Sequence, residues 1–143
     1  MKIAIGGDHA GYELKARLIT RLRGQGHEVV DFGTGGPESV DYPDYVHPLA
    51  KSVVAKDTDF GILVCGSGNG VCMTANKYAE IRAALCWTPE LGKLARQHNN
   101  ANVLCLPARF ISEETAFEIM DNFLTTDFEG GRHQNRVDKI AIK

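Results

Sequence analysis

Short apolar runs alternate with helix-like periodicity along the first half of the chain. Ile3-Ala4-Ile5 stops at two glycines and predicts a buried strand. Apolar residues recur every three or four positions from Tyr12 to Arg23, which predicts an amphipathic helix that glycines bring to an end. Residues 28–32 predict a second strand, 33–43 a loop rich in Gly, Pro, Ser and Asp, and 45–56 a second helix.

The second half of the chain repeats this alternation. Residues 60–65 are apolar without a polar side, as in a strand that is covered on both faces. The segments beyond it predict a helix to about 78, a strand at 82–86, a helix at 88–98, a strand at 103–106, and helices at 112–124 and 132–140. This order implies an α/β fold, with a five-stranded parallel sheet, helices on both faces and a C-terminal helix.

The composition is typical of one globular domain, which we expect to span residues 1–143. Of the 143 residues 43% are hydrophobic and 24% are charged. Sixteen basic against eighteen acidic residues give a net charge of −2, which argues against a dedicated nucleic-acid or membrane-surface binder. Four cysteines without a C-x-x-C pair, together with no signal peptide and no long apolar span, predict reduced thiols in a cytoplasmic protein.

A glycine-rich loop follows the strand predicted at 60–65. Gly66-Ser67-Gly68-Asn69-Gly70 would expose backbone N–H groups between a strand and a helix, where they can bind a phosphate or a transition-state oxyanion. A tight turn that needs glycine only for steric reasons is the alternative. The spacing is not G-x-G-x-x-G, and no G-x-x-x-x-G-K-[ST] occurs, so nucleotide binding fits poorly.

Cys65 is the last residue of the strand before this loop. Oriented N–H groups would favour its thiolate, so Cys65 could act as a base or nucleophile, although an inert buried thiol fits the pattern equally well. Asp8 follows the first strand, where it could also simply cap a helix. We expect Asp8, Cys65 and His98 to converge on one edge of the sheet, where parallel sheets bind ligands.

The remaining candidate chemistry consists of arginines and histidines. Arg132 and Arg136 are four residues apart on one helical face and could bind a phosphate dianion, although a solvated basic face is the default for such pairs. The five histidines and four cysteines make no H-x-x-x-H or H-E-x-x-H motif, so the sequence predicts no metal site.

Several motifs together resemble one enzyme family from end to end. They are Gly7-Asp8-His9, Asp41-Tyr42-Pro43, Cys65 to Gly70, Ala75-Asn76-Lys77, Arg96-Gln97-His98-Asn99 and Gly130-Gly131-Arg132-His133. This set closely resembles the ribose-5-phosphate isomerase B family, which also includes allose-6-phosphate isomerase and the galactose-6-phosphate isomerase subunits.

The resemblance implies a Rossmann-like three-layer α/β/α domain that forms a homodimer, or a tetramer made of two such dimers, with an active site built from both copies. It implies interconversion of ribose 5-phosphate and ribulose 5-phosphate by ring opening and a cis-enediolate, without metal or cofactor. Cys65 would accept the proton, His98 with Asp8 would open the sugar ring, and the Ser67 hydroxyl would hydrogen-bond in the catalytic loop. The implied substrate contacts are Asp8, His9, Tyr42, Gly66, Ser67, Gly68, Asn69, Gly70, Asn99, Arg109, Arg132 and Arg136.

The family has two versions of its base. In one a Cys ends the third strand, and in the other a Glu follows the last glycine of the loop. This sequence has Cys65 and Val71 at those positions and resembles the Cys version, although Ser67 and Asn69 also occur in the Glu version. Three alternatives stay open: an isomerase of a six-carbon sugar phosphate such as allose 6-phosphate or galactose 6-phosphate, a nucleotide-binding regulatory module, and a non-catalytic subunit.

Overall fold

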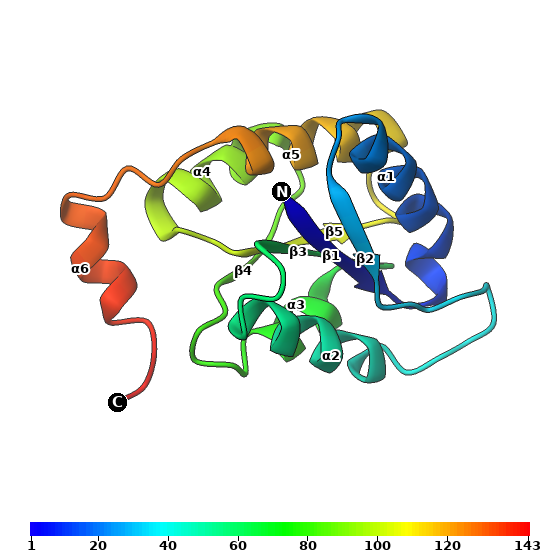
Figure 1. The fold of residues 1–143 in the computed structure, drawn as a ribbon, viewed down its shortest axis with the longest axis horizontal. Coiled ribbons are helices and arrows are strands. Elements are labelled where there is room, and N and C mark those ends of the chain that lie inside the picture. The colour runs from blue at the N-terminus through cyan, green and yellow to red at the C-terminus, as the bar shows by residue number, and fades with distance from the viewer.

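Five parallel strands form one sheet in the order β2-β1-β3-β5-β4 in the computed structural model, which describes all 143 residues (Figure 1). The strands are β1 (Lys2–Gly7), β2 (Glu28–Asp31), β3 (Phe60–Cys65), β4 (Ala83–Leu85) and β5 (Val103–Pro107). In the register of the sheet, Gly61 lies opposite Val103 and Cys65 lies opposite Pro107. The parallel five-stranded sheet predicted from the alternation of patterns is therefore confirmed.

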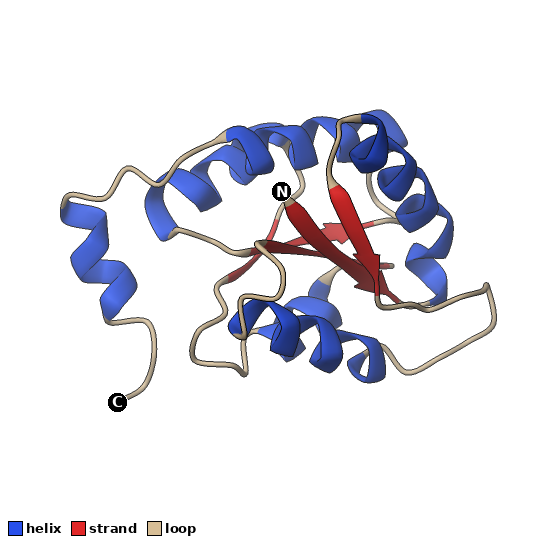
Figure 2. Cartoon of the chain, in the orientation of Figure 1, coloured by secondary structure: helices blue, strands red, loops and turns tan.

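Helices cover both faces of the sheet and complete a three-layer α/β/α arrangement (Figure 2). One face carries α1 (Tyr12–Gly24), α4 (Pro89–Asn99) and α5 (Glu113–Thr125), and the other carries α2 (Pro43–Val54) and α3 (Asn69–Ala75). The last helix, α6 (Arg132–Asp138), packs beside α4. No helix combines the length and the apolar character that crossing a bilayer requires.

Two hydrophobic cores lie on the two faces of the sheet. Because successive strand residues point to opposite faces, Ile62 and Val64 pack in one core, while Leu63 and Cys65 pack in the other. Both faces are covered, and this explains why β3 shows no polar alternation. The larger core includes Phe123 of α5, which is fully buried against Phe60 with ring centroids 5.6 Å apart.

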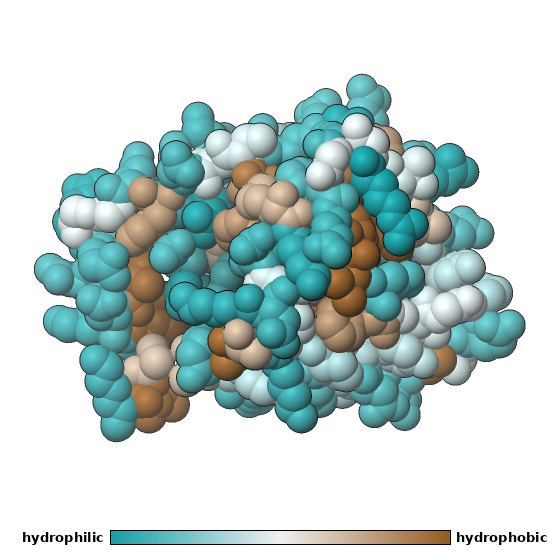
Figure 3. All heavy atoms as spheres, viewed as in Figure 1, coloured by the Kyte–Doolittle hydropathy of each residue, from teal (hydrophilic) through white to brown (hydrophobic).

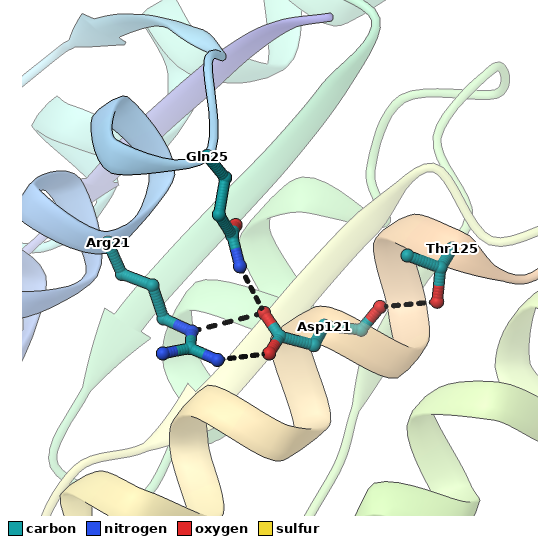
Figure 4. Close-up of polar contacts among 4 residues, drawn as sticks. All are labelled: Arg21, Gln25, Asp121 and Thr125. Atoms are coloured by element: carbon teal, nitrogen blue, oxygen red, sulfur yellow. Dashed lines mark hydrogen bonds and ion pairs between the residues drawn. The ribbon is translucent and has the colours of Figure 1, made fainter.

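A polar contact ties α1 to α5 (Figure 4). The guanidinium of Arg21 donates a bidentate pair of hydrogen bonds to the carboxylate of Asp121, and the side-chain amide of Gln25 donates to the same carboxylate over 3.1 Å. Partial burial raises the pKa of Asp121, but the hydrogen bonds from Arg21 and Gln25 and the charge of Arg21 outweigh this effect. The pKa of Asp121 therefore lies below its ordinary value.

The strand order places a switch point between β1 and β3, the two central neighbours. The chain leaves β1 toward β2 on one side and later returns past β1 to β3 on the other. The helix after β1 packs on one face of the sheet and the helix after β3 on the opposite face. Open α/β sheets bind ligands beyond the carboxyl ends of the strands at such a point.

Candidate active site

The glycine-rich loop holds the thiol of Cys65 at the carboxyl end of β3. The backbone N–H of Gly68 donates a hydrogen bond to Cys65 Sγ over 3.1 Å, and Asn69 N–H donates to Ser67 Oγ over 3.2 Å. Gly68 adopts a left-handed conformation with φ of 78°, which directs the chain into α3. The backbone N–H groups of Ser67 and Gly70 have no hydrogen-bond partner within the chain. The loop therefore offers free donors beside a sulfur that is already hydrogen-bonded.

Asp8 lies next to this loop, at the carboxyl end of β1. Its backbone N–H donates to the carbonyl of Val64 over 3.3 Å. Its side chain caps a short 3-10 helix, η1 (His9–Gly11), because Oδ1 accepts the N–H groups of Ala10 and Gly11 over 3.0 and 3.3 Å. The capping alternative for Asp8 is thus confirmed, but Oδ2 accepts no hydrogen bond from the chain and is left for another ligand.

Two glycines allow β1 and η1 to lie directly against the main chain of β3. A Cβ atom at Gly7 would lie 2.0 Å from the carbonyl oxygen of Val64, and one at Gly11 would lie 2.4 Å from the same atom. Both separations are far shorter than any van der Waals contact. The two main-chain segments are therefore in direct contact, and this contact sets the position of Asp8 beside the loop after β3.

Side chains from three further segments reach the same edge. His9 Nδ1 accepts the N–H of Val40, which ties η1 to the loop at 33–42. The ring of Tyr42 lies over Gly70, because a Cβ atom added at Gly70 would lie 2.8 Å from the hydroxyl oxygen of Tyr42. Arg109 follows β5, donates its backbone N–H to the Gly66 carbonyl over 3.0 Å and lays its side chain against Gly66.

His98, Asn99, Arg132 and Arg136 do not join this group, so the expected convergence of Asp8, Cys65 and His98 within one chain is wrong. A helix that follows a strand runs back antiparallel to it, and the end of α4 therefore lies where β5 begins. Val103 and Pro107 of β5 are about 13 Å apart at about 3.3 Å per residue. Figure 1 shows α6 at the left of the molecule and the loop at 33–42 at the right.

His98 has its own surroundings at this amino edge of the sheet. Its ring stacks on that of His133 with centroids 4.4 Å apart, and Glu129 lies within ion-pair distance of both rings. Desolvation lowers the pKa of His133, and His98 and Arg132 lower it further, which favours a neutral imidazole. Sequence reasoning missed Glu129, because it belongs to no linear motif and meets His98 only in the folded chain.

A cavity of about 490 Å³ opens next to these residues. Asn99, Tyr78 and Arg82 line it together with the C-terminal residues Ile140 and Ile142. Ile140 is 53% exposed and Ile142 is 99% exposed, so the cavity has an apolar rim that is open to solvent. Figure 3 shows apolar atoms gathered on this side of the molecule.

The other cysteines lie in the packed layers. Burial raises the pKa of Cys86 to about 12, and burial also raises the pKa of Cys105 well above its ordinary value. Both are inert thiols, as the sequence predicts. Cys72 is partly buried, and its thiol donates to the carbonyl of Ala83 and faces β4.

Comparison with known proteins gives one consistent relationship. The sequence pattern of the family described as Ribose/Galactose Isomerase matches residues 3–140. Ribose-5-phosphate isomerase B of Escherichia coli strain K12 is 45% identical over 140 residues, which make up 98% of this chain and 94% of that protein.

Solved structures agree with this relationship. The crystal structure of a ribose 5-phosphate isomerase from Thermotoga maritima is 54% identical, with a TM-score of 0.96 over 98% of this chain and 97% of that one. Ribose 5-phosphate isomerase B of Mycoplasma genitalium with bound ribulose-5-phosphate is 46% identical, with a TM-score of 0.93 over 97% and 93% of the two chains. The chain therefore belongs to the ribose/galactose isomerase family.

Proposed function

We propose that this chain is an aldose–ketose isomerase that interconverts ribose 5-phosphate and ribulose 5-phosphate. The observation that carries the proposal is the Cys65 thiol, hydrogen-bonded by Gly68 beside free N–H groups of the same loop. The relatives are named as ribose-5-phosphate isomerases, and one of them holds ribulose-5-phosphate. These names favour the five-carbon substrate over the six-carbon alternative.

The chemistry starts with a closed furanose that must be opened. The unpartnered Oδ2 of Asp8 and an imidazole are suitable groups to move the proton between the ring oxygen and the C1 hydroxyl. The thiolate of Cys65 then takes the proton from C2, and the electrons form a cis-enediolate. The free N–H groups of Ser67 and Gly70 stabilise its oxygen charge. The thiol then returns the proton to C1 while the proton of the C2 hydroxyl moves to O1, which leaves the ketone at C2.

We propose further that two copies of the chain share each active site as a homodimer. His98, Asn99, Arg132 and Arg136 lie at the opposite edge of the sheet from Cys65, so a second copy must bring them to the thiol. The exposed Ile140 and Ile142 beside the cavity at that edge support the contact, because apolar side chains that gather in an exposed patch mark interaction surfaces.

In this arrangement cationic groups from both copies bind the substrate phosphate. Arg109 lies at the carboxyl edge beside Gly66, and Arg132 and Arg136 would come from the partner copy's α6. The remote phosphate then supplies binding energy that positions C1 and C2 at Cys65. The four cysteines are all free, which supports the proposal that the enzyme acts in the reducing cytoplasm.

Turnover in the presence of a chelator tests the proposed reaction. Pure protein incubated with ribose 5-phosphate and EDTA should form ribulose 5-phosphate, and kcat/KM should be higher than for allose 6-phosphate. For Cys65→Ala we expect proton exchange at C2 to be lost while the substrate still binds. Absence of the ketose, or turnover abolished by EDTA, would contradict the proposal.

A further inference from the structure

Three side chains with metal-binding atoms meet at the amino edge of the sheet. His98 comes from the end of α4, Glu129 from the segment between α5 and α6, and His133 from the first turn of α6. One ligand atom of each lies within 4.8 Å of the other two. No linear motif contains the set, and this explains why spacing alone predicts no metal site.

The atoms of this cluster face one another without hydrogen bonds. Nε2 of His98 and Nε2 of His133 lie 3.7 and 3.5 Å from the same oxygen, Oε1 of Glu129. Both distances exceed those of ordinary N–H···O hydrogen bonds. The three groups are therefore close together without being hydrogen-bonded to one another.

The main chain holds the cluster in place. The N–H of Glu129 donates to the carbonyl of Gln97 over 3.0 Å, which fixes the segment before α6 to the end of α4. The side chain of His133 is 10% exposed, while those of His98 and Glu129 are 43% and 50% exposed. One ligand is thus anchored by packing, and the other two leave an open approach for an ion.

Two imidazoles and one carboxylate form a donor set that zinc takes in enzymes, with a fourth position left to water. Zinc binds such atoms at about 2.0–2.2 Å, so two ligands of a tetrahedral ion are about 3.3 Å apart. The 3.5 and 3.7 Å separations approach this geometry, and the two stacked imidazole rings must turn so that both Nε2 atoms face one ion. We propose that His98, Glu129 and His133 bind a Zn²⁺-type transition-metal ion, which withdraws His98 from catalysis and inhibits the enzyme.

The surroundings limit which ion binds and how tightly. Arg132 and Arg136 act electrostatically on His133, and their positive charge disfavours any cation. The single carboxylate offers too few oxygens for Ca²⁺ or Mg²⁺, whereas imidazole nitrogen suits zinc. The site is therefore selective for transition metals, and we expect micromolar rather than nanomolar affinity.

The test starts with binding, because only the inhibition depends on the proposed function. Zinc titrated into metal-free protein in a calorimeter should bind with one ion per chain, and Co²⁺ in its place should give the visible absorption of a tetrahedral site. Glu129→Gln keeps the size of a half-exposed side chain and should weaken binding about tenfold or more. His133→Asn should do the same.

Two control variants remove other imidazole donors. His47→Ala takes away an exposed imidazole elsewhere on the surface, and His27→Ala removes the one that lies 3.2 Å from the N-terminal amine. Both should bind zinc as the unsubstituted chain does. Unchanged affinity in Glu129→Gln, or affinity lost in any control instead, would overturn the proposal.

The inhibition is measured separately on turnover of ribose 5-phosphate. Zinc should inhibit the unsubstituted enzyme, EDTA should restore the rate, and Glu129→Gln should need about ten times more zinc for the same inhibition. Saturable binding at the cluster without any inhibition would contradict the role assigned to His98. If the chain does not turn over ribose 5-phosphate at all, the proposed function fails while the binding result still decides the metal site.

Discussion

Mixing two inactive variants, Cys65→Ala and His98→Ala, tests whether one active site takes residues from two copies. In one chain Cys65 ends β3, while His98 precedes β5 at the other edge of the sheet. The length of β5, about 13 Å, separates those edges, whereas proton transfer needs groups within hydrogen-bond reach of one substrate. Each variant alone should lose about 10²–10⁴-fold in kcat, the usual contribution of a general acid or base.

The mixture should recover a defined fraction of the activity. Random exchange of equal amounts makes half of the dimers mixed, and each mixed dimer has one intact site out of two. The recovered rate is therefore about a quarter of the unsubstituted rate, as two-fold symmetry requires. The assay follows ribulose 5-phosphate after the two proteins are unfolded and refolded together, with each variant refolded alone as a control.

A second mixture distinguishes shared sites from separate ones. The double variant Cys65→Ala/His98→Ala, exchanged with an equal amount of unsubstituted chain, should leave about a quarter of the full rate if sites are shared, and about half if each chain works alone. No recovery in the first mixture together with half of the rate in the second would refute the shared site.

Three other substitutions test separate parts of the structure. Gly68→Ala places a Cβ 2.4 Å from Leu85 at a φ of +78°, so kcat/KM should fall about tenfold or more with an unchanged circular dichroism spectrum; unaltered turnover would contradict the role of the loop. Asp121→Asn should lower the thermal midpoint at neutral pH. The carboxylate of Asp121 has a lowered pKa in the folded chain, so it adds its full stability only when the pH is above the ordinary pKa of an aspartate. The difference from the unsubstituted chain should begin to shrink as the pH falls below about 4, the ordinary pKa of an aspartate, and should vanish once the pH is below the lowered pKa of Asp121; a difference that stays constant as the pH falls would exclude the contact with Arg21 as the cause. Phe123→Ala should cost about 3–5 kcal/mol in urea unfolding, and a loss below about 1 kcal/mol would show that the core relaxes into the space.

The order of elements could be predicted from the sequence because the signals are local. Continuous apolar runs such as β3 and glycine stops such as Gly24 mark ends within a residue or two of those observed. The order of the strands within the sheet could not be predicted from the sequence, because the placement of β5 between β3 and β4 depends on packing between distant segments.

The candidate site was predictable to the extent that it depends on strand ends. Asp8, Cys65 and Arg109 follow strands, and parallel strands bring their carboxyl ends to one edge. His98 lies in the last turn of α4, and because α4 runs antiparallel to the strands, that turn lies at the other edge. Glu129 carries no motif, and its significance emerges only when α6 folds back beside α4.

The direct contact of Gly7 and Gly11 with the main chain of Val64 also bears on how the sequence can vary. Contacts made by side chains can be remodelled, since another rotamer or an aliphatic residue of similar volume fills the same space. A main-chain contact has no such freedom, so the position of Asp8 beside β3 does not depend on which aliphatic residues fill the two cores. Substitutions deep in the sheet should therefore erode stability long before they move this carboxylate, whereas one methyl group at either glycine would displace it at once.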